Sequence, residues 1–186
     1  MNILYTLTCF VWLASEILLG RLMHSGEGDK KNTDRKTLSF IWILIAIAIA
    51  ASVIISKNIS APIIASDDMM YIGACIILIG MLFRFSVIKS LGRFFTVDVT
   101  IRQDHSLKTT GYYKYIRHPS YLASYISFLG YGLSLNNYIS LLAVAILLLI
   151  AFNRRIVVEE ALLEEQFGNV YRDYKRKTKK IIPFVF

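Results

Sequence analysis

Long apolar runs with few charges constrain this chain more than any other feature of its sequence. Three of them cover residues 3–19, 38–56 and 69–88. At about 1.5 Å of rise per residue, helices of this length cross or nearly cross a hydrocarbon core of about 30 Å. Backbone polar groups inside a bilayer must be paired within the protein, so such runs form helices. The sequence therefore predicts an all-α membrane protein, and its 55% hydrophobic content and mean hydropathy of +0.52 agree.

Two shorter apolar runs follow at residues 121–135 and 138–152, and only Asn136 and Asn137 separate them. So short a connection predicts a helical hairpin. A helix of about 15 residues reaches about 22 Å, which is less than a typical hydrocarbon core. We therefore expect the hairpin to lie low in the bundle or to thin the bilayer around it. With the three longer runs, the sequence predicts about five transmembrane helices.

A helical period resumes after the hairpin, over residues 155–177. It predicts an amphipathic helix that continues the last span into the cytosol. Gly168 is the point at which this helix would bend or be interrupted. We expect the apolar end of the chain, residues 181–186, to tuck back against the protein or the bilayer. The apolar face of the helix consists of Leu162, Leu163, Phe167, Tyr171 and Tyr174.

The basic residues are distributed very unevenly. Of the 21 lysines and arginines, 19 fall in segments that the predicted spans place on one side, and the exceptions are Lys57 and Arg84. The positive-inside rule makes that side cytosolic, with the N-terminus outside and the C-terminus in the cytosol. Topology and attraction to anionic membrane lipid then explain the net charge of +8, so we expect no nucleic-acid partner. Cys9 and Cys75 form no metal-ligand pattern, so no metal site is predicted.

Two charged residues lie within predicted spans. Glu16 is near the cytosolic end of the first span, and its simplest interpretation is an interfacial carboxylate, because charges near helix ends reach the interface at little cost. Arg84 interrupts the third span. It either snorkels towards the cytosolic end, which we favour, or pairs with a carboxylate inside the bundle.

Polar clusters stand at both feet of the predicted hairpin. His118 and Tyr121 lie where the chain enters it, and Arg155 and Glu159 lie where the chain leaves it. An apolar excursion of roughly 30 residues returns the chain to the side it left, so we expect these side chains to meet at the membrane surface. Pro119 suits the first helical turn, where a missing N–H costs nothing. This meeting place is the candidate active site.

Each of these residues also has a simpler interpretation. Arg155 and Glu159 are four apart on a predicted helix, and such a pair is commonly a surface ion pair of little energetic value. Glu159 and Glu160, followed by Glu164 and Glu165, fit a solvated helix face. A histidine before a proline can simply end a loop. The two clusters favour a site because they occupy the two feet of one hairpin.

At these residues the chain resembles the isoprenylcysteine carboxyl methyltransferase family, within the integral-membrane methyltransferases that also include phospholipid methyltransferases. The resemblance runs from about Gly92 to Pro183. Its order and spacing are those of the family, and they are more specific for fold and cofactor than for the acceptor. The matching elements are Leu91, Gly92, Phe94, Phe95, His105–Lys108, Gly111–Tyr113, Arg117–Tyr121, Arg155, Glu159, Glu160, Phe167, Gly168 and Tyr171.

The resemblance implies that S-adenosylmethionine binds in a cytosol-facing pocket and leaves as S-adenosylhomocysteine. Arg155 matches the position that engages the acceptor, and Arg155 and Glu159 are the implied catalytic pair. At Asp98 the better-known eukaryotic members have a glutamine, so this position departs from the family. The residues implied to line the cofactor pocket are His105, Ser106, Leu107, Lys108, Tyr113, His118, Pro119, Ser120, Tyr121 and Glu159.

The resemblance also sets expectations for the whole chain. We expect residues 1–186 to form one domain, with three spans in residues 1–88 and the cofactor-binding and catalytic region in residues 89–186. The chain is similar to the compact prokaryotic type with five spans, which favours a bacterial plasma membrane over the endoplasmic reticulum. The expected partner is a lipophilic small molecule or lipid-linked group, of which prenylated-protein carboxyl methylation is one option.

The chemistry agrees with these residue types. Methyl transfer is an in-line displacement from a sulfonium, so a site mainly has to hold donor and acceptor close and aligned. Glu159 can offset the positive charge of the cofactor, while Tyr113 and Tyr121 can contact its adenine or sulfonium. A carboxylate acceptor is already ionised and would be oriented by Arg155. A phenol, thiol or amine would need proton removal, with Glu159 or His118 the nearest candidates.

Two other functions stay open at this point. Sterol reductases look similar in the C-terminal hairpin and helix and bind NADPH there, although no dinucleotide glycine fingerprint is visible in this chain. A non-catalytic membrane scaffold, whose charges only set topology and lipid contact, is the alternative from a different class. Cofactor binding distinguishes the three.

Overall fold

The computed structural model describes residues 2–22, 30–31, 35–66, 68–92, 95, 100–101 and 107–182. Within these ranges the only strands form one antiparallel pair, in which Lys30 lies opposite Ile101. The predicted helical fold class is confirmed, whereas the short strand pair was not predicted. The elements in chain order are α1 (Ile3–Leu22), β1 (Lys30–Lys31), α2 (Arg35–Asn58), α3 (Asp68–Leu91), β2 (Thr100–Ile101), the 3₁₀ helix η2 (Gly111–Lys114), α4 (Pro119–Ser134), α5 (Tyr138–Phe167) and α6 (Asn169–Lys177).

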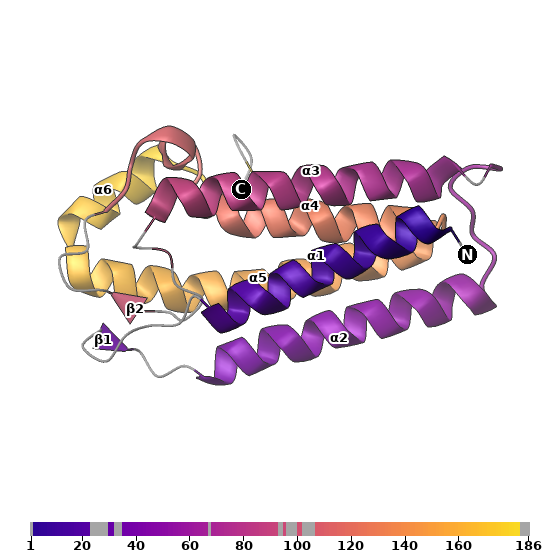
Figure 1. Ribbon diagram of the computed structural model, residues 1–186. Coiled ribbons are helices and arrows are strands. Elements are labelled where there is room, and N and C mark those ends of the chain that lie inside the picture. The colour runs from indigo at the N-terminus through magenta and orange to yellow at the C-terminus, as the bar shows by residue number, and fades with distance from the viewer. Residues whose placement is uncertain are drawn as a thin grey trace.

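The long helices α1 to α5 lie side by side, and α6, β1 and β2 gather at one end, here named the α6 end (Figure 1). Among the described residues, four helices are long and apolar enough to cross a membrane: Ile3–Arg21, Thr37–Asn58, Asp68–Leu91 and Tyr138–Phe167. The remaining long helix, α4, has 16 residues. It is therefore the short member of the bundle, as expected for the first half of the hairpin.

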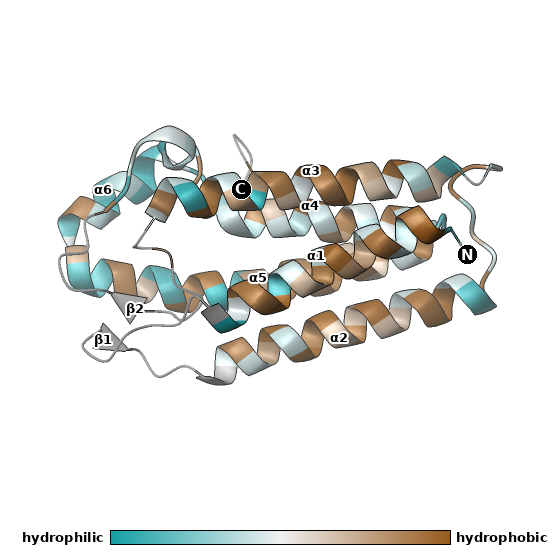
Figure 2. Ribbon diagram, in the orientation of Figure 1, coloured by the Kyte–Doolittle hydropathy of each residue, from teal (hydrophilic) through white to brown (hydrophobic). Residues whose placement is uncertain are grey.

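Apolar side chains point outwards along the bundle. Brown, hydrophobic positions predominate on α1, α2 and α3, whereas α4 is paler and α6 is mostly hydrophilic (Figure 2). Leu82, in the middle of α3, is 66% exposed, and Ile43 and Ile146 are also exposed. Such a surface is unfavourable in water but suits the acyl chains of a bilayer. The protein is therefore an integral membrane protein.

Small residues let α3 and α4 approach until their backbones touch. A Cβ atom on Gly73 would lie 2.5 Å from the carbonyl oxygen of Gly130, and one on Gly130 would lie 2.7 Å from the backbone nitrogen of Ile77. Close approach through small residues is how membrane helices gain packing contacts without a hydrophobic driving force. The pairing of α3 with α4 fixes where the first foot of the hairpin stands.

The hairpin turn is tied to the connection between α2 and α3. Oδ1 of Asn136, a residue with a φ of 46°, accepts hydrogen bonds of 3.1 Å from the backbone N–H groups of Ile63 and Ile64. Asn137 caps α5 by accepting from the Ser140 N–H at 3.0 Å. The two asparagines that predicted a turn therefore also hold the bundle together at the end opposite α6.

The prediction that Glu16 and Arg84 reach the interface separately was wrong. Arg84 Nε lies 2.8 Å from Glu16 Oε1, and the two side chains are 14% and 13% exposed. Arg84 Nη1 also donates to the Ser120 hydroxyl at 2.7 Å. Pairing inside the bundle satisfies both charges where they are, so neither side chain has to extend to water. The alternative of an internal carboxylate partner is the one that the structure shows.

The last long helix extends well beyond the predicted span at residues 138–152. Helix α5 runs for 30 residues, from Tyr138 to Phe167. Gly168 then adopts a φ of 52° and separates α5 from α6. Glycine tolerates this left-handed conformation at no steric cost, so the interruption falls where the sequence predicted it. Helix α5 thus carries side chains from the apolar bundle to the α6 end.

Candidate active site

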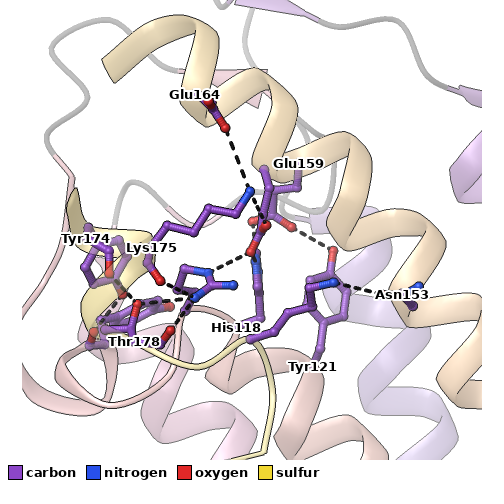
Figure 3. A network of polar contacts seen from close by, with 12 residues as sticks. His118, Tyr121, Asn153, Glu159, Glu164, Tyr174, Lys175 and Thr178 are labelled. Carbon is purple, nitrogen blue, oxygen red and sulfur yellow. Dashed lines mark hydrogen bonds and ion pairs between the residues drawn. The ribbon is translucent and has the colours of Figure 1, made fainter. Parts of the chain in front are cut away.

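The structure brings the two feet of the hairpin together. Pro119 is the first residue of α4, so His118 and Tyr121 flank the start of that helix, and Glu159 faces them from α5. The Tyr121 hydroxyl donates to Glu159 Oε2 at 3.0 Å. His118 Nδ1 lies 3.8 Å from Glu159 Oε1, which is beyond hydrogen-bond distance (Figure 3). Glu159 is 33% exposed, so part of its carboxylate can still accept from a ligand.

These side chains stand in the wall of a cavity with a volume of about 200 Å³. Lys108 also lines it, and its ammonium group donates to the backbone carbonyl of Ser90 at the end of α3. His105, Ser106 and Asp98 lie outside the described residues. The predicted site residues that line the cavity are Leu107, Lys108, Tyr113, His118, Pro119, Ser120, Tyr121, Arg155 and Glu159.

Arg155 is not part of a surface ion pair, and that simpler interpretation was wrong. Its side chain is 2% exposed because α2 packs along this part of α5. Arg155 Nη1 donates to the Thr37 hydroxyl on α2 at 2.7 Å. A buried guanidinium held in place next to the cavity can present N–H donors to a planar anion such as a carboxylate.

Glu160 does not belong to a solvated helix face, which corrects a second interpretation. It is 6% exposed, and three cationic or polar groups surround its carboxylate. Arg117 Nε lies 2.7 Å away, while His118 Nε2 and Lys175 Nζ each lie 3.2 Å away. Because Glu160 is one of four nearby glutamates, the sequence did not distinguish it from its neighbours. The one sign of burial was the apolar Ile156, which lies four residues earlier on the same helix face.

The segment after α6 lies against the loop that carries His118. Ile116 and Lys179 form an isolated parallel bridge, and the Arg117 N–H donates to the Lys179 carbonyl at 2.8 Å. The His118 N–H donates to the Lys180 carbonyl at 3.1 Å. Ile181 is fully buried, so the expected return of the chain holds at this residue, while residues 183–186 lie outside the described ranges.

Three buried tyrosines complete the wall near α6. The Tyr174 hydroxyl donates to the Tyr113 carbonyl at 2.6 Å, and the rings of Tyr171 and Tyr174 are 6.1 Å apart. Burial raises the pKa of all three phenols, so they stay protonated. Within the part of the chain that the structure describes, the Tyr171 hydroxyl has no hydrogen-bond partner.

The opposite part of the cavity is apolar. Helix α1 packs on α3 and α2 packs on α5, and both contribute to this part of the wall. Trp42, which is partly exposed on the outside of the bundle, is one of its residues. The other apolar residues and glycine on α1 and α2 are Leu13, Gly20, Leu38, Ile41 and Ile45, and Glu16, paired with Arg84, also lines this part. One cavity therefore joins a polar wall at the α6 end to an apolar wall within the bundle.

Across the described ranges, no group of three or more His, Cys, Asp or Glu side chains could hold a metal ion. The arrangement offers the partly exposed carboxylate of Glu159, buried guanidinium groups and several aromatic rings. It is suited to binding and aligning a polar ligand with an apolar one.

Comparison with known proteins identifies the family. The model of the isoprenylcysteine carboxyl methyltransferase family matches residues 71–165, just over half of the chain. The chain belongs to this family. Members share the region that contains α4 and the cavity-lining part of α5, so both feet of the hairpin fall inside the match.

Several curated methyltransferases of this family are similar to the chain. The protein-S-isoprenylcysteine O-methyltransferase of Schizosaccharomyces pombe is 37% identical over 109 residues, which cover 58% of this chain and 46% of that protein. Protein-S-isoprenylcysteine O-methyltransferase B of Arabidopsis thaliana is 36% identical over 115 residues, covering 61% and 58%. The chain thus spans about half the length of the curated relatives it matches.

A solved structure extends the similarity beyond the hairpin. The eukaryotic intramembrane Ras methyltransferase of the isoprenylcysteine carboxyl methyltransferase family superposes with a TM-score of 0.62 at 26% identity. The alignment covers 83% of this chain and 54% of that one. Most of the bundle, and not only residues 71–165, therefore follows the architecture of the family.

Proposed function

We propose that this protein transfers a methyl group from S-adenosylmethionine to a lipophilic acceptor at the cytosolic membrane interface. The observation that carries the proposal is a cavity in which the polar residues at the two ends of the hairpin meet an apolar wall from α1 and α2. A polar cofactor from the cytosol and an apolar acceptor from the bilayer have to meet at such a place. Membership of the family and the names of the relatives support the reaction class.

The polar wall fits S-adenosylmethionine. Bound there, the cofactor would supply an electrophilic methyl group on a sulfonium. Glu159 lies partly exposed in the cavity, where its carboxylate can offset positive charge or accept from an amino group. The Tyr121 hydroxyl donates to Oε2 of Glu159, and Oε1 of Glu159 faces His118. Tyr113 supplies an aromatic face for the adenosyl part. His105 and Ser106 remain predicted contacts.

We propose a carboxylate as the acceptor group, which the relatives' names, isoprenylcysteine O-methyltransferases, support. Such a group is ionised at neutral pH, so no general base is needed. Arg155 is fixed by Thr37 beside the cavity and can orient it by paired N–H···O contacts. The apolar wall around Trp42 would take the attached lipid chain, which enters laterally from the bilayer. A phenol, thiol or amine acceptor would need His118 or Glu159 as base.

The orientation is proposed from charge. Of the 21 lysines and arginines, 19 belong to segments on the side of the predicted spans that includes α6. The positive-inside rule then puts the α6 end in the cytosol and the N-terminal end of α1 outside. The same basic residues attract anionic membrane lipid. A bacterial plasma membrane stays a prediction, as does the assignment of the cofactor region to residues 89–186.

Calorimetric titration of the detergent-purified protein with S-adenosylhomocysteine tests the proposal directly. We expect the wild type to bind and Glu159→Gln to bind at least about tenfold more weakly, because a charge-assisted hydrogen bond is lost. Glu165→Gln, an exposed carboxylate on the same helix, is the matched control and should bind as the wild type does. Binding of NADPH in place of S-adenosylhomocysteine would support a reductase instead. Binding of neither would contradict the proposal.

A further inference from the structure

Glu160 stands directly behind the wall of the cavity. Glu160 does not line the cavity. Its carboxylate contacts Arg117 and His118, and both of these residues do line the cavity. Its own side chain is 6% exposed, so neither water nor a ligand in the cavity contacts much of it. Whatever Glu160 does for the site, it does through these two neighbours.

The carboxylate of Glu160 is fully surrounded by donors. Its Oε1 accepts from Arg117 Nε at 2.7 Å and faces His118 Nε2 at 3.2 Å, and its Oε2 faces Lys175 Nζ at 3.2 Å. The guanidinium of Arg117 and the ammonium of Lys175 therefore balance the negative charge of the buried carboxylate. Arg117 also donates to the Lys175 and Thr178 carbonyls, so the loop before α4 is bound to the segment after α6.

The contact with Glu160 determines which ring nitrogen of His118 carries a proton. An ionised carboxylate only accepts hydrogen bonds, so a ring nitrogen at 3.2 Å from Glu160 has to carry its proton. The hydrogen bond made by one nitrogen sets the tautomer and fixes the orientation of the ring. Nδ1 is then the nitrogen on the side of Glu159, 3.8 Å from Oε1.

We propose that Glu160 is a positioning residue, which holds a proton on His118 Nε2 and keeps Arg117 and His118 in place so that His118 presents Nδ1 to the bound ligand. The inference rests on the proposed function, because it takes the ligand to be S-adenosylmethionine. Glu160 is not a catalytic residue, since it touches neither the cavity nor a reacting atom. Its effect is on the affinity of the site for the adenosyl ligand.

Glu164 provides a matched control. It lies one turn beyond Glu160 on α5 and also faces Lys175 Nζ, at 3.8 Å, while its Oε1 accepts from Arg172 Nε at 2.8 Å. Within the described part of the chain it forms no hydrogen bond or ion pair with His118, and it does not line the cavity. Glu160→Gln and Glu164→Gln therefore remove the same charge from the same helix and the same lysine. They differ in the contacts with Arg117 and His118, which Glu160 makes and Glu164 does not make.

Titration with S-adenosylhomocysteine gives the first test. We expect Glu160→Gln to weaken binding about tenfold or more, the usual effect of losing a supporting charged hydrogen bond, and Glu164→Gln to stay within about twofold of the wild type. Equal affinities for the two variants overturn the inference. Failure of the wild type to bind S-adenosylhomocysteine would overturn the proposed function and, with it, the ligand named here.

Nitrogen-15 NMR of histidine-labelled protein gives a second test, in which the protonation of the His118 ring is measured on the wild type itself. The chain has three histidines, and comparison with His118→Asn identifies the signal of His118. We expect a protonated Nε2, in a neutral or a charged ring. A bare Nε2 with the proton on Nδ1 overturns the inference. In folded Glu160→Gln the Nε2 signal should shift, whereas a merely structural role would leave it unchanged.

Discussion

Arg84 on α3 and Glu16 on α1 form an ion pair of 2.8 Å inside an apolar helical bundle, and both side chains line the candidate active-site cavity. The same guanidinium donates to the Ser120 hydroxyl at the start of α4. One arginine therefore joins three helices. Glu16 lies outside the region matched by the family model, residues 71–165, whereas Arg84 and Ser120 lie inside it. The pair fixes the position of α1 relative to the shared region.

Breaking this pair should destabilise the protein strongly. Arg84→Met leaves the Glu16 carboxylate unpaired among apolar side chains, and removing one partner of a buried ion pair costs roughly 3–5 kcal/mol. Glu16→Gln should cost about as much. The double variant removes both charges and should recover most of the loss. Thermal or denaturant unfolding in detergent measures all three, and a double variant as unstable as the sum of the single variants would contradict the prediction.

The close contact between α3 and α4 predicts a different response to glycine substitution in two helices. Gly130→Ala places a Cβ 2.7 Å from the Ile77 backbone nitrogen, so the helices must separate, and overpacking typically costs about 1–3 kcal/mol. Gly20→Ala on α1 is the matched control, because its Cβ would meet only the Trp42 ring at 3.7 Å. The stability in detergent should fall for the first and stay unchanged or rise for the second. Equal effects would mean that the α3–α4 contact is looser than described.

Local patterns in the sequence were sufficient for the helices and for the hairpin. Uninterrupted apolar runs defined the spans, and Asn136 and Asn137 marked the turn, because turn chemistry and hydrophobic periodicity depend only on neighbouring residues. The same topology brings His118 and Glu159 to one end of the bundle. The meeting of the two hairpin feet therefore follows from the chain path, without knowledge of which helices pack together.

Contacts between helices distant in sequence were not predictable in this way. The partner of Arg84 is 68 residues away on α1, and no local pattern says that α1 lies beside α3. The sequence predicted a solvated Glu160, whereas α6 and the following segment cover it. A helical period shows which residues share a face, but it does not show what covers that face. The two-residue strand pair likewise carries no periodic signal.

Replacing tyrosine by phenylalanine should change the stability of the protein differently at two positions near α6. Tyr174→Phe removes a 2.6 Å hydrogen bond to the Tyr113 carbonyl and leaves that carbonyl unsatisfied, which should cost about 1–3 kcal/mol. Tyr171→Phe removes a buried hydroxyl that has no partner among the described residues, so stability should stay the same or rise. Denaturant unfolding of the two variants in the same detergent checks the contrast. Similar losses in both would show that the Tyr171 hydroxyl is satisfied.

The same phenols predict how stability changes in alkali. Burial raises the pKa of Tyr113, Tyr171 and Tyr174, whereas tyrosines in the unfolded chain ionise near pH 10. Above about pH 10 the unfolded state therefore binds fewer protons than the folded state, and stability falls as pH rises. Each retained proton contributes up to about 1.4 kcal/mol per pH unit. Unfolding measured from pH 9 to 11 should show a shallower fall for Tyr171→Phe, and parallel curves would contradict it.

Arg155 should affect turnover far more than cofactor affinity. The guanidinium is held by Thr37 beside the cavity and is proposed to orient the acceptor, while Glu159 is proposed to hold the cofactor. Arg155→Ala should therefore lower kcat about 100-fold, as expected when a reacting group is misplaced by about 1 Å, and leave S-adenosylhomocysteine affinity within about twofold. Arg155→Lys keeps the positive charge but not the planar guanidinium, so its kcat should lie between those of the wild type and Arg155→Ala.

Thr37→Val separates the role of the guanidinium from that of its support. This variant removes the 2.7 Å hydrogen bond but keeps Arg155, so a loss in kcat smaller than that of Arg155→Ala is expected. Methyl transfer from labelled S-adenosylmethionine to a farnesylated cysteine in detergent measures kcat and KM for each variant. If Arg155→Ala instead weakened S-adenosylhomocysteine binding tenfold with kcat preserved, the arginine would belong to the cofactor end of the cavity. The acceptor would then have to be oriented by another cation of the wall, such as Arg84 on α3.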